Sequence, residues 1–244
     1  MIYIKQGNIL LLVILMDDVN IREIFENIYE VDLGDGLRRI ATRSIVKGKK
    51  VYDERIIKIN NEEYRIWNPN KSKLAAAIIN GLKIVPIKRD SKVLYLGASA
   101  GTTPSHVADI AEQGMIYAVE YAPRIMRELL DACAERKNIV PILGDANKPQ
   151  EYSHIVEKVD VIYEDVAQPN QAEILIKNAK WFLKKGGYGM IAIKARSIDV
   201  AKNPREIFKE QKEILEKGGF EIVDEVDIEP FEKDHIMFVG VWRG

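Results

Sequence analysis

The sequence contains few of the residues that build disulfides and metal centres. Among 244 residues there are one cysteine, Cys133, and three histidines. A single cysteine excludes an intrachain disulfide and fits the reducing cytosol, so we expect a cytoplasmic protein. The same scarcity leaves little material for a zinc site, and we expect no metal. Cys133 is expected to pack a helix, and His106 and His154 to lie at the surface or at caps.

An excess of positive charge is missing as well. The 36 Lys and Arg residues are balanced by 37 Asp and Glu residues, which gives a formal net charge of −1. Because sequence-independent RNA affinity depends on the number of neutralised phosphates, the chain has too little positive charge to hold RNA unaided. One acid-free basic stretch contains Arg38, Arg39, Arg43, Lys47, Lys49 and Lys50. It is interpreted either as a patch facing RNA or a partner, or as a solvated sheet face.

The apolar runs are too short to span a membrane. The run Ile9–Met16 is far below the ~20 residues that a span requires, so we expect no membrane association. Asp17 and Asp18 follow it, without the small-residue cleavage site of a signal peptide. Residues 1–15 are interpreted as an extension that forms an extra strand, or as a start assigned too early, with Met16 the native start.

Residues 16–69 have the pattern of a small antiparallel β domain. Short strand-like runs alternate with turn-forming residues such as Gly34-Asp35-Gly36 and Asn60-Asn61. Pro69 and Ser72 then predict a helix that runs to about Asn80. The expected strands of the small domain cover residues 28–31, 39–42, 50–52 and 56–59.

From residue 93 onward, apolar runs of strand length alternate with amphipathic runs of helix length. This alternation is typical of a parallel, doubly wound sheet. The last two strands are too close in sequence for a helical crossover, so they predict an antiparallel hairpin. Residues 70–244 are therefore expected to form an α/β domain with a Rossmann-like, seven-stranded sheet that ends in this hairpin. The expected strands are 93–96, 115–120, 139–143, 159–164, 188–194, 220–228 and 235–242, and the helices are 103–112, 123–136, 171–183 and 204–217.

The stretch 93–103 has the order of strand, small-residue loop and helix start. Gly97 and Gly101 have the spacing G-x-x-x-G, which differs from the G-x-G-x-x-G of a dinucleotide fingerprint. Such a loop lets backbone N–H groups approach a ligand closely, and the helix N-terminus adds positive potential. It is predicted to bind a ligand.

Polar residues follow the carboxyl ends of the expected parallel strands, where open α/β sheets bind ligands. Glu120 stands 23 positions after Gly97 and suits a bidentate bond to a ribose diol. Asp145 and the backbone amide of Ala146 are placed to contact the edge of an adenine ring. These residues predict a nucleoside-containing ligand.

This set resembles class I S-adenosylmethionine (SAM)-dependent methyltransferases, and longer runs narrow the resemblance. The chain is similar to fibrillarin, the 2′-O-methyltransferase of box C/D guide-RNA particles, from about Asp17 to Gly244. The Gly/Arg-rich tail of eukaryotic fibrillarins is missing, so the chain resembles the compact archaeal form. The runs that carry the resemblance are YRIWNP (64–69), SKLAAAI (72–78), LYLGASAGTT (94–103), DVAQP (165–169) and EKDH (232–235).

The resemblance implies an enzyme that methylates rRNA and tRNA with SAM as cofactor. It also implies four partners: a box C/D guide RNA, the substrate RNA, a Nop-family scaffold protein and a kink-turn-binding ribosomal-type protein. The residues it assigns to SAM are Gly97, Ala98, Ser99, Gly101, Thr102, Thr103, Glu120, Tyr121, Asp145, Ala146, Asp165 and Gln168.

The resemblance further implies a catalytic set of Lys73, Asp165, Lys194 and His235. Asp165 and Lys194 end two adjacent expected strands, and His235 begins an antiparallel strand, which places all three at one edge. Lys73 lies in the first turn of a helix, where the macrodipole disfavours a cation and favours loss of a proton. One lysine would take the proton of a ribose 2′-hydroxyl, and the other cation would stabilise the developing alkoxide. The sequence leaves open which lysine is the base.

Each catalytic candidate also has an alternative without function. Lys73 would be a surface lysine, Lys194 would form a structural ion pair with Asp165, and His235 would cap the hairpin. Two other functions remain open at this point. One is an NAD-dependent oxidoreductase that uses the same glycine loop and Glu120, and the other is an inactive RNA-binding or assembly module.

Overall fold

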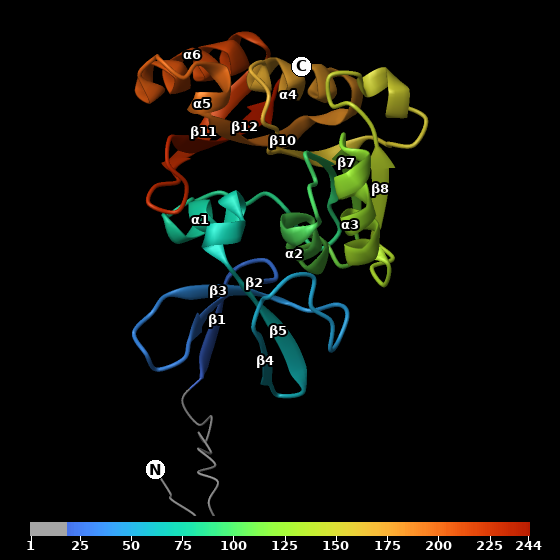
Figure 1. Cartoon of the computed structure of the whole chain (residues 1–244), viewed down its shortest axis with the longest axis vertical. Coiled ribbons are helices and arrows are strands. Elements are labelled where there is room, and N and C mark those ends of the chain that lie inside the picture. The colour runs from blue at the N-terminus through green and yellow to red at the C-terminus, as the bar shows by residue number, and fades with distance from the viewer. Residues whose placement is uncertain (1–18) are drawn as a thin grey trace, which may run out of the picture.

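A computed structural model describes residues 19–244 of the chain. Two β-sheets lie one above the other along the long axis of the molecule, with helices α1 (Lys73–Ile79) and α2 (Thr102–Ile110) between them (Figure 1). Both helices belong to a core that also contains Ile28 and Ile40 of the smaller sheet. The interpretation of residues 1–15 concerns a segment outside the described residues.

The smaller sheet is antiparallel, as expected, and two of its strands were not predicted. Its order is β1-β2-β3-β5-β4, and β1 and β5 are the additional strands. Residues 50–52, which were expected to form a strand, do not, because the amides of Val51 and Tyr52 donate to the Glu54 carboxylate instead. The strands are β1 (Asn20–Phe25), β2 (Ile28–Asp32), β3 (Arg39–Arg43), β4 (Ile56–Ile59) and β5 (Glu62–Trp67).

The larger sheet has seven strands in the order β11-β12-β10-β9-β6-β7-β8. Its last two strands form the predicted antiparallel hairpin, and the five others are parallel. The strand order reverses between β6 and β9, so the carboxyl ends of these strands form the switch point where such sheets bind ligands. The strands are β6 (Lys92–Leu96), β7 (Met115–Glu120), β8 (Ile139–Leu143), β9 (Val159–Glu164), β10 (Leu183–Lys194), β11 (Phe220–Asp227) and β12 (His235–Trp242).

Helices cover both faces of the larger sheet. Helices α1, α2 and α3 pack in one core cluster, and α4 and α6 pack in the other. Strand β10 begins at Leu183, five residues before the predicted start, and Gly186 and Gly187 lie inside it. The remaining helices are α3 (Pro123–Cys133), α4 (Gln171–Phe182), α5 (Ala195–Ile198) and α6 (Pro204–Lys217), with 3-10 turns η1 (Pro69–Lys71) and η2 (Pro149–Tyr152).

Four buried charged residues join the region of the small sheet to α2 and to the turn after α3, and we call Glu54, Arg65, Asp109 and Arg136 the buried ion cluster. The Arg65 guanidinium on β5 lies 2.8 Å from Glu54 and 2.7 Å from Asp109 of α2. Arg136 binds the other oxygen of Asp109 at 2.5 Å. Each side chain of the cluster is at most 2% exposed, so these charges compensate one another without water.

His106 lies in the interior, and its predicted placement at the surface or a cap is wrong. Its Nδ1 is 2.7 Å from Thr42 Oγ1 and its Nε2 is 2.8 Å from the Tyr52 hydroxyl, while the ring stacks on Trp67. The small sheet covers α2, which explains the burial. Burial, together with the Arg65 charge, lowers the pKa of His106 well below 6.5. The buried Cys133 is confirmed as a helix-packing residue.

The basic stretch between Arg38 and Lys50 is largely neutralised by ion pairs. Three of its arginines bind carboxylates at 2.6–2.7 Å, and Lys47 and Lys49 lie 3.9 Å and 2.7 Å from glutamates. This favours the solvated-face interpretation over an RNA-binding patch. Within residues 19–244, no helix is long and apolar enough to cross a membrane.

Candidate active site

The glycine loop leaves β6 at the switch point, where it passes very close to β9. Gly97 has φ of +82°, and a Cβ atom on it would lie 2.3 Å from the backbone oxygen of Asp165. The Asp165 amide in turn donates to the Leu96 carbonyl at 3.0 Å. Both the left-handed backbone and the close approach therefore require glycine. Gly101, also at positive φ, is the N-cap of α2.

A cavity of about 460 Å³ opens beside this loop, at the carboxyl ends of β6, β7, β8 and β9. Of the residues assigned to SAM, it is lined by Gly97, Ser99, Glu120, Tyr121, Asp145, Ala146, Asp165 and Gln168. Asn147 also lines it and was not predicted, although its position directly after Asp145-Ala146 was a usable signal.

Glu120 is fixed by the backbone around the cavity. One carboxylate oxygen accepts from the Ser99 amide at 2.9 Å, and the other accepts from the Ala122 amide at 2.8 Å. Each oxygen retains a lone pair, so the carboxylate can accept from the two hydroxyls of a ribose. This arrangement suits the role that the sequence suggested for it.

A second cavity of about 290 Å³ adjoins the first. The two share Gly97, Ser99 and Asp165, which lie at the switch point. Three of the other four SAM candidates, Ala98, Thr102 and Thr103, line the second cavity together with Lys71, Lys73 and Lys194, whereas Gly101 lines neither cavity. The candidate cofactor residues therefore span both cavities, and the two catalytic lysines lie in one of them.

Asp165 forms an ion pair with Lys73, not with Lys194 as the structural alternative assumed. The Lys73 ammonium lies 2.9 Å from the Asp165 carboxylate, and each side chain is about one-fifth exposed (21% and 23%). Lys194 lines the same cavity at the end of β10. The structure thus brings together residues that are 92 positions apart in the chain.

His235 lies beside Lys194 but makes no hydrogen bond with the other three candidates among the described residues. Its Cα is the register partner of Lys194 across β10 and β12. Its Nδ1 donates to the Lys233 carbonyl at 2.7 Å, so its Nε2 carries the lone pair, and this buried nitrogen has no partner within residues 19–244. Burial lowers the pKa of His235, and the nearby Lys73 charge acts in the same direction. At neutral pH His235 is therefore an uncharged acceptor.

Comparison with known proteins identifies the family. The family model described as Fibrillarin matches residues 19–244. The chain belongs to the fibrillarin family. A fibrillarin-like rRNA/tRNA 2′-O-methyltransferase of Methanocaldococcus jannaschii is 87% identical over 229 residues, which cover 94% of this chain and 100% of the relative. This membership decides against the NAD-dependent oxidoreductase.

Solved structures of fibrillarins have the same fold. The chain is similar to Aeropyrum pernix fibrillarin in complex with natively bound SAM, with a TM-score of 0.85 and 51% identity over 91% of this chain and 97% of that one. It is also similar to a chain of a fibrillarin/Nop5p complex, with a TM-score of 0.83 and 44% identity over 91% and 100% of the two chains. The class I methyltransferase fold expected from the sequence is thereby confirmed.

In this member of the fibrillarin family, Gln171 holds the backbone of Lys194, a role that the sequence did not reveal. The Gln171 side chain is fully buried. Its Oε1 accepts from the Lys194 amide at 2.9 Å, and its Nε2 donates to the Gln168 carbonyl at 2.8 Å. One amide therefore links the end of β10 to the loop that carries a cofactor candidate. The sequence offers no signal for this contact, because it depends on the packing of α4 against β10.

Glu164 is a buried acid directly before Asp165. It is fully buried, and neither carboxylate oxygen has a hydrogen-bond partner in the described part of the chain. Burial raises the pKa of Glu164 well above 4.5, and the charge of Asp165 adds to this. Burial therefore disfavours a charge on Glu164, directly before Asp165 in the chain.

Proposed function

We propose that this protein is a SAM-dependent ribose 2′-O-methyltransferase that acts on rRNA and tRNA as the catalytic subunit of a box C/D guide-RNA particle. The observation that carries the proposal is the Lys73–Asp165 ion pair in the cavity that adjoins the candidate cofactor cavity. Both cavities are lined by Asp165, so a cofactor bound in the larger one and a substrate bound in the smaller one would come together beside this residue. Family membership supports the same activity.

The residues of the larger cavity fit SAM. Glu120 would accept from the two ribose hydroxyls, and Asp145 with the Ala146 amide would contact the adenine edge. The small residues of the glycine loop would bring backbone N–H groups close to the rest of the molecule. SAM supplies a methyl group on a sulfonium leaving group, so the protein has mainly to position the acceptor and handle one proton.

The four catalytic candidates are suited to handle that proton. In the transfer, the 2′-oxygen forms a bond to the methyl carbon as the carbon–sulfur bond breaks, and the hydroxyl proton passes to the protein. We assign proton acceptance to the amine of Lys73 or Lys194, with the second cation stabilising the alkoxide. Asp165 orients Lys73, and His235 Nε2 offers an acceptor that completes the chain.

Site selection is assigned to partners. The net charge is −1, and the basic stretch is largely paired with acids. A protein with so few unpaired cations neutralises few phosphates. We therefore propose that a guide RNA selects the nucleotide, and that a Nop-family scaffold and a kink-turn-binding ribosomal-type protein complete the particle. A fibrillarin solved in complex with Nop5p supports the scaffold.

The test compares methyl incorporation by the protein alone and by the particle reconstituted with guide RNA and both partner proteins. We expect SAM to bind the protein alone, and transfer at the guide-specified 2′-hydroxyl only in the particle. SAM binding without any transfer in the particle would instead support an inactive assembly module. Equal, site-specific transfer by the protein alone would contradict the assignment of site selection to partners.

A further inference from the structure

We propose that Lys71 binds the phosphodiester on the 3′ side of the target nucleotide, and that Asp53 competes with this phosphate for the lysine. Lys71 lines the same cavity as Lys73 and Lys194 and lies two residues before Lys73. In RNA the 3′-phosphate is joined through the 3′-oxygen to the carbon next to the one that bears the 2′-hydroxyl. A 2′-hydroxyl among the catalytic lysines therefore brings this phosphate into the same cavity. The inference rests on the proposed function.

Of the three lysines that line this cavity, Lys71 is the one without a role in the proposed reaction, so it can bind a phosphate. Lys73 is engaged with Asp165, and Lys194 is assigned to proton handling. Lys71 instead forms an ion pair with Asp53 at 2.5 Å, in which the two side chains are 44% and 72% exposed. An exposed pair contributes little net stability, so a phosphate can replace the carboxylate at little cost.

The segment between β3 and β4 supports Lys71 through Tyr52. The Lys71 ammonium lies 5.6 Å from the centre of the Tyr52 ring, a distance at which a cation is attracted to an aromatic face. The Tyr52 hydroxyl is fixed in turn by the buried His106 Nε2 at 2.8 Å. The lysine is thus directed by a rigid aromatic support while its ammonium can exchange one anion for another.

The experiment measures single-turnover methyl transfer in the reconstituted particle, with a substrate strand shortened until its half-saturating concentration can be determined. Lys71→Ala should raise that concentration about tenfold, the scale of one charge-assisted hydrogen bond. Lys71→Arg should restore it to within about twofold, because guanidinium also binds phosphate. Asp53→Asn should lower it by about two- to threefold, since it removes the competing anion. SAM affinity should be unchanged in all three variants.

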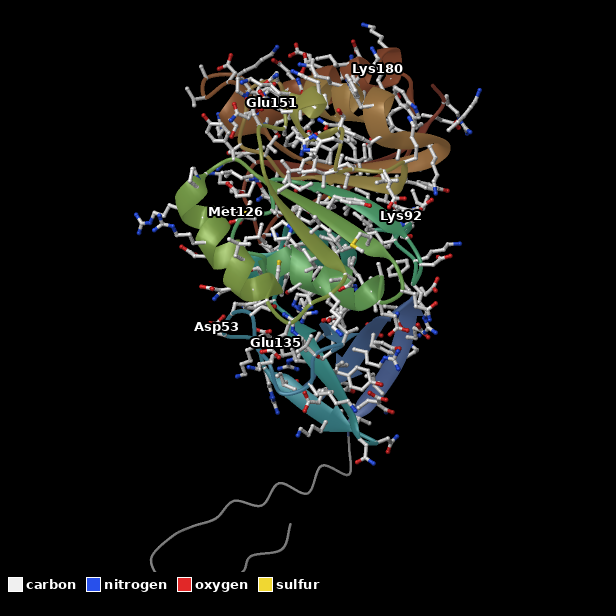
Figure 2. All side chains as sticks on the ribbon, turned by 90° about the vertical axis from the view of Figure 1, so that its right-hand side faces the viewer. Asp53, Lys92, Met126, Glu135, Glu151 and Lys180 are labelled. Carbon is white, nitrogen blue, oxygen red and sulfur yellow. The ribbon has the colours of Figure 1, made fainter. Side chains whose placement is uncertain are left out.

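Lys92→Ala is the matched control. Lys92 forms a similar exposed ion pair, with Glu157, at the start of β6. Figure 2 shows Lys92 and Asp53 on opposite sides of the molecule. Its substitution should leave the half-saturating concentration within about twofold of the original.

A neutral methylphosphonate at the linkage 3′ of the target nucleotide decides whether the lysine meets that phosphate. With the unmodified protein, it should raise the half-saturating substrate concentration about as much as Lys71→Ala does. In the Lys71→Ala variant it should cause little further increase. Additive effects, or a lower affinity in Asp53→Asn, would overturn the inference. If the unmodified particle fails to methylate the all-phosphate substrate, the proposed function itself is wrong.

Discussion

The molecule contains two clusters of opposite charges that are built in different ways. In the buried ion cluster, Arg65 reaches two carboxylates and the Ser105 hydroxyl, and every side chain is withdrawn from water. In the candidate active site, the Lys73–Asp165 pair is about one-fifth exposed and borders an open cavity. In the first arrangement Arg65 is fully occupied by its protein partners. The Lys73–Asp165 pair can still form hydrogen bonds to a molecule bound in the cavity.

The two buried histidines differ in the same way. Both nitrogens of His106 have protein partners, whereas His235 has a partner for Nδ1 only. Because a buried polar atom without a partner costs free energy, its retention at a strand end beside Lys194 needs a reason other than stability. His106 thus helps to hold the small sheet on α2, whereas Nε2 of His235 stays available at the candidate site.

The strongest test of this contrast is Arg65→Ala. It would leave Glu54 and Asp109 buried without their cation, so we expect the free energy of unfolding to fall by about 3–5 kcal/mol. Chemical denaturation followed by circular dichroism measures the loss. Lys212→Ala, which removes an exposed pair with Glu225, is the control and should cost less than ~1 kcal/mol. A loss of that small size for Arg65→Ala would show that the buried ion cluster is not structural.

Substitution of Lys73, Lys194 or Asp165 by alanine should affect the reaction instead of the fold. We expect each variant to lower single-turnover transfer at least ~10²-fold, a usual scale for proton-handling groups. For Lys73→Ala and Asp165→Ala the free energy of unfolding should change by only ~1 kcal/mol or less.

Arginine variants then separate the two lysines. Arginine keeps the charge but cannot lose a proton, so the variant at the base stays inactive and the variant at the other lysine recovers activity. Near-normal rates in either alanine variant would show that this lysine is structural.

Glu120→Ala should weaken SAM binding by about 1.5–3 kcal/mol, the range for loss of a charged acceptor. Isothermal titration of the purified protein measures it. Glu157→Ala removes an exposed carboxylate near the opposite edge of the sheet and is the control. Unchanged SAM affinity in a folded Glu120→Ala protein would remove this residue from the cofactor site.

The smallest effect concerns pH. The folded state holds His106 neutral, with its pKa below 6.5, whereas the unfolded chain protonates it near that value. The unfolded state therefore binds more protons below pH 6.5, and the stability that neutral His106 contributes is lost as the pH falls. The destabilisation by His106→Gln should be largest above pH 6.5 and shrink by up to ~1.4 kcal/mol per pH unit below it. A destabilisation that does not change with pH would contradict the buried neutral histidine.

The sequence predicted strand bounds best where the apolar pattern of a run matches the burial of its side chains. Strands β7, β8, β9 and β12 have the predicted bounds because their runs are mostly apolar on both faces, and all but β8 are largely buried. Strand β5 was missed because its inward positions carry Glu63 and Arg65 as well as Trp67. Its inward face contains charges whose partners lie on distant segments, and local pattern cannot show them.

Some features of the candidate site could likewise be predicted from the sequence, and others could not. The glycine loop, Glu120 and the strand-end residues follow from position in the chain, because parallel strands bring their carboxyl ends to one edge. The pairing of Asp165 with Lys73 and the support of Lys194 by Gln171 depend on how helices α1 and α4 dock on the sheet. The interior position of His106 likewise follows from the docking of the small sheet on α2.

The cap of α1 makes a further contact across this arrangement. Ser72, the N-cap residue directly before Lys73, accepts a hydrogen bond at 2.9 Å from the hydroxyl of Thr103. Thr103 lies in the first turn of α2, directly after the glycine loop. The residue before the candidate catalytic Lys73 and the residue after the candidate cofactor loop are thus directly linked. The relative placement of the candidate donor loop and Lys73 therefore depends on a single pair of hydroxyls.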